Sequence, residues 1–150
     1  MQKSFIILHH SLTKDSETVS WGAIRKYHFL TLGWKNIGYA FGVELLGDSH
    51  EILFGRFPEE RGAHCKNAMM NERGIGICVV GNFDVKVPTV GAWETTKKLV
   101  RWLMLKYSIS SSAVIGHREA QAMDNVPLKQ RKTCPGIMFN MEKFRMELSA

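Results

Sequence analysis

Hydrophobic residues along the chain fall into short apolar runs and longer stretches in which they recur at helical spacing. The short runs predict β-strands at residues 5–9, 38–44, 51–56, 75–80 and 113–116. Helical spacing predicts helices at residues 90–107 and 139–148, and a first helix that runs from capping candidates at residues 13–16 through Val19 to a stop at Gly33. The order strand, helix, three strands, helix, strand, helix favours an α/β fold with a central mixed β-sheet flanked by about three helices.

Two stretches lack either pattern. Residues 57–73 are long and mostly polar, and loops of this length inside compact domains are usually functional or mobile. Residues 118–136 are irregular in the same way. Residues 46–49 contain Gly and Asp and suit a hairpin turn, whereas residues 75–80 are apolar throughout, as expected of a central strand covered on both faces.

Composition places the chain among ordinary globular proteins. Its 150 residues are 45% hydrophobic and 23% charged, which suits one domain over residues 1–150 and excludes a disordered or membrane-embedded protein. No apolar run is long enough to span a membrane. Only four apolar residues, 5–8, precede His9, which is too short for the core of a signal peptide, so we expect cytoplasmic synthesis without one.

Charge and cysteine content narrow the picture further. The net charge of +6 predicts an anionic partner, which can be a nucleic acid, an anionic lipid or a cell-wall polymer. Three cysteines without a close-spaced pair argue against a disulfide framework. Cys78 lies in an apolar run and is expected in the core, whereas Cys65 is either a bystander or a partner of Cys78.

Histidine and cysteine residues far apart in the chain suggest a metal site. Two imidazoles and the Cys134 thiolate would leave one tetrahedral position of a zinc ion open, as in catalytic zinc sites. His117 follows a predicted strand, and nearby cations favour the thiolate form of Cys134. His9 and His10 point to opposite faces of their strand, so alternation does not choose between them. Structural roles for all these residues remain the alternative.

Several segments occur in the order seen in zinc N-acetylmuramoyl-L-alanine amidases. They are residues 5–13, 33–41, 62–64 and 74–81, followed by His117 and Lys132-Thr133-Cys134-Pro135. The chain therefore resembles the amidase-type lysozymes of bacteriophages and is similar to peptidoglycan recognition proteins. The resemblance runs from Phe5 to the C-terminal helix, which is essentially the whole chain.

The resemblance implies one zinc ion per chain. It selects His9 over His10, and the implied ligands are His9, His117 and Cys134. It also implies two catalytic residues, Tyr39 and Lys132. In an extended segment residues two apart share a face, so Lys132 can point toward a metal that Cys134 binds.

The resemblance is weakest at the expected substrate rim. Within residues 57–73, His64 and Asn67 are the expected substrate contacts. Ala40 replaces a polar residue of many relatives, and Gly74 replaces the usual Ser. Residues 67–73 also form a longer segment than in the phage lysozymes. Glu44 and Glu119 are further acids to which we assign no role.

The function implied by the resemblance is peptidoglycan hydrolysis. Zinc-activated water would cleave the amide bond between N-acetylmuramic acid and L-alanine of the stem peptide. This predicts a bacteriolytic monomer of the endolysin type, from a phage or prophage, that acts on the cell wall after holin-mediated release, with a host recycling enzyme as the alternative origin. A non-catalytic peptidoglycan-binding module is the first alternative. A basic nucleic-acid-binding protein is the second, although no nucleic-acid motif supports it and we expect no such partner.

Overall fold

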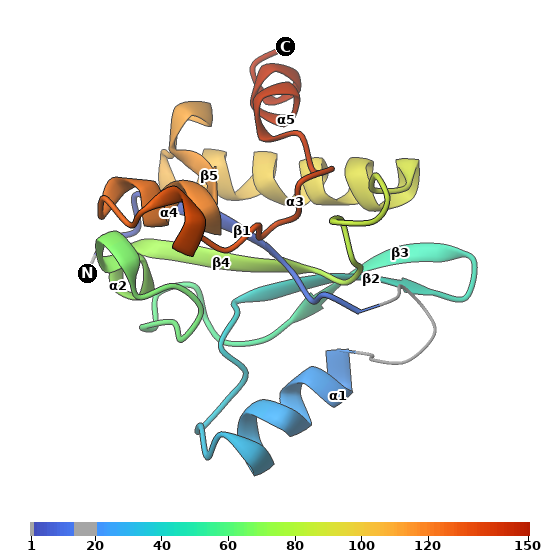
Figure 1. Ribbon diagram of the computed structural model, residues 1–150. Coiled ribbons are helices and arrows are strands. Elements are labelled where there is room, and N and C mark those ends of the chain that lie inside the picture. The colour runs from blue at the N-terminus through green and yellow to red at the C-terminus, as the bar shows by residue number, and fades with distance from the viewer. Residues whose placement is uncertain (1, 14–20) are drawn as a thin grey trace.

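The computed structural model describes residues 2–13 and 21–150 and contains one mixed five-stranded sheet (Figure 1). The strands are β1 (Phe5–His10), β2 (Phe41–Leu46), β3 (Ser49–Phe54), β4 (Gly74–Val79) and β5 (Val114–Gly116). Their order across the sheet is β3-β2-β4-β1-β5. The hairpin β2–β3 is antiparallel, and the other neighbours pair in parallel. The predicted α/β fold class is confirmed.

Helices cover both faces of this sheet. They are α1 (Trp21–Lys26), which continues into a π-helical turn at Tyr27–Thr31, α2 (Met70–Arg73), α3 (Val90–Tyr107), α4 (His117–Met123) and α5 (Met141–Leu148). In Figure 1, α3 and α5 lie above the sheet and α1 lies below it. Helix α4 packs beside α2 and the short 3-10 turn Asn67–Met69 that precedes α2.

Alternation along β1 separates two packing environments. Ile6 and Leu8 join the main hydrophobic core, which includes the buried faces of α3 and α5. Ile7 belongs to a smaller cluster on the other face, and His9 shares that face because residues two apart in a strand point the same way. In the parallel register His9 lies opposite Cys78 of β4.

Two segments that we predicted to be irregular contain short helices. Helix α4 begins at His117 because the Glu119 carboxylate accepts the backbone N–H of Gly116 at 2.7 Å, which is one half of a capping box. Helix α2 follows two residues with left-handed backbone, Ala68 (φ 48°) and Met69 (φ 57°). Neither helix is long enough to show a hydrophobic period, so the sequence pattern could not reveal them.

A buried lysine ties residues 57–73 to the sheet. The Lys3 ammonium donates to the backbone carbonyls of Glu60 at 2.9 Å, Glu72 at 2.7 Å and Gly74 at 3.3 Å. Burial lowers the pKa of Lys3, and Glu72 and Glu59 partly oppose that shift. This stretch is therefore a structured wall.

Three remaining expectations concern single elements. Within the first predicted helix, the candidates at residues 14–16 and Val19 lie outside the described residues. Cys65 and Cys78 are both buried free thiols, so they form no disulfide with each other. In the described part of the chain, no helix has the length and apolarity needed to cross a membrane.

Candidate metal centre

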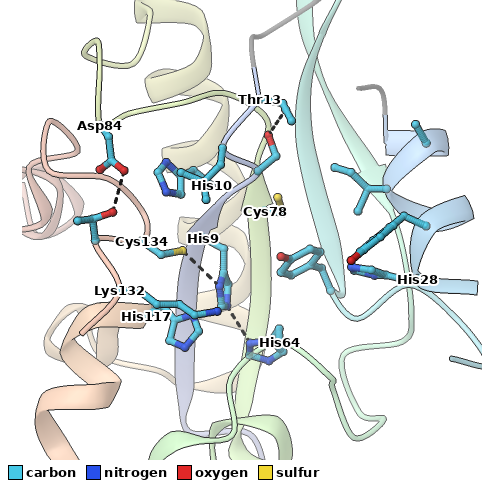
Figure 2. A pocket seen from close by; sticks show the side chains of 17 residues that line it. His9, His10, Thr13, His28, His64, Cys78, Asp84, His117, Lys132 and Cys134 are labelled. Carbon is cyan, nitrogen blue, oxygen red and sulfur yellow. Dashed lines mark hydrogen bonds between the residues drawn. The ribbon is translucent and has the colours of Figure 1, made fainter. Parts of the chain in front are cut away.

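The three predicted metal ligands converge at one end of the sheet (Figure 2). His9 comes from the C-terminal end of β1, His117 from the first position of α4, and Cys134 from the loop between α4 and α5. One ligand atom from each side chain lies within 4.8 Å of the other two. All three residues are buried, with exposed fractions of 2%, 7% and 8% respectively.

The separation of two of these atoms fits a tetrahedral zinc ion. His9 Nδ1 and Cys134 Sγ are 3.6 Å apart. Ligands at about 2.1 Å (nitrogen) and about 2.3 Å (sulfur) from a tetrahedral zinc ion would lie about 3.6 Å from each other. The donor set therefore suits this metal in both chemistry and spacing.

The structure distinguishes the two adjacent histidines. His10 shares the face of Ile6 and Leu8, and its Nδ1 accepts the backbone N–H of Phe83 at 3.2 Å. The His10 ring also stacks on the Phe83 ring, with 6.1 Å between ring centroids. His10 therefore holds the loop after β4, and His9 is the one that faces Cys134.

Burial controls the protonation of the cluster. It lowers the pKa of His117 to about 4, and the Lys132 charge adds to this shift. Burial also holds the pKa of His9 well below its usual range, assisted by His64 and His117. Both imidazoles are thus neutral at pH 7, and a neutral ring has a lone pair free for a metal.

The Cys134 thiol behaves differently from our expectation. Burial raises its pKa to about 12, and this outweighs the opposite effects of the cations Lys132 and Arg118. The cations alone do not produce a thiolate here. A divalent cation next to the sulfur would do so, because a coordinating thiol is deprotonated.

Arg118 holds the loop that carries Cys134. Its backbone N–H donates to the Cys134 carbonyl at 2.9 Å. Its guanidinium donates to the carbonyls of Thr133 at 2.9 Å, Gly136 at 2.6 Å and Phe139 at 3.0 Å. Sequence reasoning missed this residue, because its partners are carbonyl groups that leave no trace in the sequence. Its position directly after His117 was the only available signal.

Both predicted catalytic residues line the cavity above the cluster. The Tyr39 ring centroid lies 5.2 Å from that of His9. Burial raises the pKa of Tyr39 well above its usual range, so its phenol remains a proton donor at pH 7. Lys132 is exposed, and Figure 2 shows its side chain beside His9 and His117.

The two residues predicted for the substrate rim lie in different places. His64 lines the cavity, and its Nδ1 is 2.9 Å from His9 Nε2. Asn67 does not line it. Its side-chain amide donates to the Asp124 carboxylate at 3.0 Å, which joins the wall formed by residues 57–73 to the end of α4.

The two acids without an assigned role have structural partners. Glu44 is buried and accepts the backbone N–H of Trp21 at the start of α1 at 2.9 Å. Glu119 caps α4 and forms an ion pair with Arg145 of α5 at 2.9 Å. Neither residue lines the cavity.

The cavity has a volume of about 670 Å³. This lies within the usual range for sites that bind small molecules. Ala23 and Ile24 of α1 and Tyr27 of the π-helical turn line one side of the cavity. Asp84, which accepts a hydrogen bond from the Thr133 hydroxyl, lies on the opposite side. The cluster of His9, His117 and Cys134 forms its floor.

The chain is similar to known amidases and peptidoglycan-recognition proteins. The N-acetylmuramoyl-L-alanine amidase family profile matches residues 1–137. Peptidoglycan-recognition protein SC2 of Drosophila melanogaster is 29% identical over 139 residues, which are 89% of this chain and 68% of that protein. An N-acetylmuramoyl-L-alanine amidase of Sus scrofa is 24% identical over 147 residues, which are 91% of this chain and 22% of that protein.

A solved structure shows the same fold. The endolysin N-acetylmuramoyl-L-alanine amidase LysCS from Clostridium intestinale superposes with a TM-score of 0.78 at 25% identity. The match covers 99% of this chain and 85% of that one. The similarity therefore extends over the sheet and its helices on both faces.

Proposed function

Since the chain belongs to the N-acetylmuramoyl-L-alanine amidase family, we propose that it is a zinc-dependent peptidoglycan hydrolase of the endolysin type. Its substrate is the amide bond between N-acetylmuramic acid and L-alanine of the stem peptide. One catalytic domain, residues 1–150, binds one zinc ion and acts on the bacterial cell wall. The resemblance to an endolysin amidase along 99% of the chain supports this proposal.

The observation that carries the proposal is the convergence of His9, His117 and Cys134. These residues come from three separate segments, yet their ligand atoms lie within 4.8 Å of one another in a buried site. Zinc in such a site supplies a Lewis acid that polarises a carbonyl group and makes water more acidic. The cavity above the three side chains leaves room for an amide substrate.

Lys132 and Tyr39 would perform the remaining tasks of amide cleavage. The carbonyl oxygen of an amide gains negative charge in the transition state, and the ammonium group of Lys132, which lines the cavity, would stabilise that charge. The departing nitrogen needs a proton. Tyr39 is a protonated phenol beside His9, so it can position water or donate that proton.

A second candidate is peptidoglycan binding without catalysis. The 29% identity to a peptidoglycan-recognition protein supports this function. The complete set of His9, His117 and Cys134 favours the hydrolase, because a binding module has no need of an open metal position.

Digestion of purified peptidoglycan separates the two candidates. We expect the zinc-loaded protein to release new alanine amino-termini without new reducing sugars, and a chelator or Cys134→Ala to abolish the release. Cys65→Ala is the matched control, because Cys65 is also a buried free thiol but does not line the cavity. If the zinc-loaded chain binds peptidoglycan but releases no product, the second candidate is supported. If the chain shows no binding and releases no product, both candidates are refuted.

A further inference from the structure

His64 lies directly behind one of the three metal-ligand candidates. Its Nδ1 is 2.9 Å from Nε2 of His9, within hydrogen-bonding distance. The two rings meet edge to face, with centroids 5.0 Å apart and an interplanar angle of 85°. The other His9 nitrogen, Nδ1, faces Cys134. His9 thus lies between His64 on one side and the metal position on the other.

We propose that His64 is a positioning residue that orients His9 for metal binding, an inference that rests on the proposed metal centre. In this arrangement Nε2–H of His9 donates to Nδ1 of His64. That hydrogen bond leaves the lone pair on Nδ1 of His9, directed toward Cys134. Histidine ligands of metals usually donate their second N–H to a fixed acceptor, which sets the tautomer and the ring orientation.

The backbone around His64 is built to hold the ring in one place. The Asn71 side-chain oxygen accepts the backbone N–H groups of His64 at 2.7 Å and Cys65 at 2.8 Å. The Asn71 carbonyl accepts the backbone N–H of Gly62 at 2.6 Å. One buried asparagine at the start of α2 therefore fixes the segment on which His64 lies.

Two glycines form a slot for the imidazole. A Cβ atom added at Gly76 would lie 2.6 Å from His64 Cγ, and one added at Gly62 would lie 2.5 Å from His64 Cδ2. No side chain larger than hydrogen fits at either position without moving the ring. The slot also prevents the ring from swinging away from His9.

The second ring nitrogen of His64, Nε2, makes no stabilising contact within the described part of the chain that would explain why a histidine lies here. Among the described residues, the buried Nε2 atom has no hydrogen-bond partner. An unpaired buried polar group is destabilising. A histidine in this place is therefore more consistent with a task at His9 than with packing alone.

Zinc affinity, measured by competition with a chromogenic chelator, tests the role of His64 without reference to activity. We expect His64→Ala to weaken zinc binding about 10–100-fold. His64→Asn should recover most of that loss, because an Asn side-chain oxygen can lie near the position of Nδ1. His64→Gln places its oxygen farther along the side chain and should recover less. His28→Ala is the control, since His28 is also buried beside the cavity but provides no ligand atom to the cluster of His9, His117 and Cys134.

The outcomes separate this proposal from the proposed function. Wild-type zinc affinity in a folded His64→Ala protein would overturn the positioning role and leave the hydrolase proposal intact. Equal affinities for the Asn and Gln variants would overturn it as well, and this comparison needs no folded alanine variant. A wild-type protein that binds zinc tightly but releases no alanine amino-termini would overturn the hydrolase and leave the role of His64 intact.

Discussion

The two faces of the sheet are built in different ways. On the face covered by α3 and α5, 18 buried hydrophobic residues of the described chain form one continuous cluster. The opposite face has two small clusters of five and three such residues. The side chains of the three metal-ligand candidates and of His64 occupy the space between α1, α2 and α4 on this face (Figures 1 and 2). Apolar burial is the main favourable term in folding, so the first face supplies most of the stability and the second can accommodate polar chemistry.

The largest expected effect tests the stabilising face. Phe144 of α5 is fully buried and packs edge to face on Trp93, with ring centroids 4.9 Å apart. Phe144→Ala should lower the free energy of unfolding by about 3–5 kcal/mol, because it removes apolar contacts and leaves a cavity. Phe5→Ala, at a half-buried position on the other face, should cost less. Denaturant unfolding of the zinc-free proteins measures both.

The same pair of variants can contradict the comparison. If Phe5→Ala destabilises the protein as much as Phe144→Ala, the stability is shared between the faces. If Phe144→Ala lowers zinc affinity while the protein is still folded, the two faces are not independent.

The second effect tests the chemical face. Lys132→Met should lower kcat about 100–1,000-fold if the ammonium stabilises charge on the substrate oxygen. Lys132 is exposed, so the thermal unfolding midpoint should not change. Lys129→Met is the matched control from the same basic segment, and its kcat on peptidoglycan fragments should equal that of the wild type. A rise in KM with an unchanged kcat, or equal losses for both lysines, would argue for general electrostatic attraction to an anionic cell-wall polymer.

The contrast between the faces also explains what the sequence could predict. Strands β1 and β4 and helices α3 and α5 were predicted within about two residues, because a short apolar run and helical spacing of apolar residues are both local signals. Helix α4 was missed because its start depends on one carboxylate, Glu119, and its length is only seven residues. The elements that pack on the core face can therefore be recognised from the pattern of apolar residues in the sequence.

The chemical face was less accessible to sequence reasoning. Alternation left His9 and His10 equivalent, and only family resemblance selected His9. The residues that hold the site in place, Arg118 and Asn71, act through hydrogen bonds to backbone groups elsewhere in the chain. Such bonds depend on folded geometry and leave no period or spacing in the sequence.

A third, intermediate effect tests how tightly the chemical face is packed. The Cβ atom of Gly76→Ala would lie 2.6 Å from His64 Cγ, so this variant should lose about 1–3 kcal/mol of stability through overpacking. It should also lower zinc affinity, because the displaced ring no longer holds His9. Calorimetric unfolding and chelator competition measure the two effects.

Gly91→Ala is the matched control for this variant. Its Cβ would lie 2.5 Å from Nδ1 of another histidine, His50, but Gly91 lies in α3 on the opposite face. Alanine is favoured over glycine inside a helix, and the partly exposed His50 ring can move. We expect no loss of zinc affinity, and a loss equal to that of Gly76→Ala would argue against a dedicated slot for His64.

The smallest effect is a pH dependence confined to the core face. The Lys97 ammonium and the Trp93 indole N–H both donate to Glu147, at 2.7 and 2.8 Å, and Lys97 is the larger cause of a pKa held below the usual 4.5. A carboxyl group with a lowered pKa in the folded state stabilises the protein above its unfolded pKa and loses this effect as pH falls through the folded value. Glu147→Gln should therefore lower the unfolding midpoint slightly at pH 7, and the difference should shrink as the pH falls below 4.5 and vanish below the lowered pKa of the folded state. A difference between Glu147→Gln and the wild type that stays the same at every pH would mean that the contact between Lys97 and Glu147 does not couple α5 to α3.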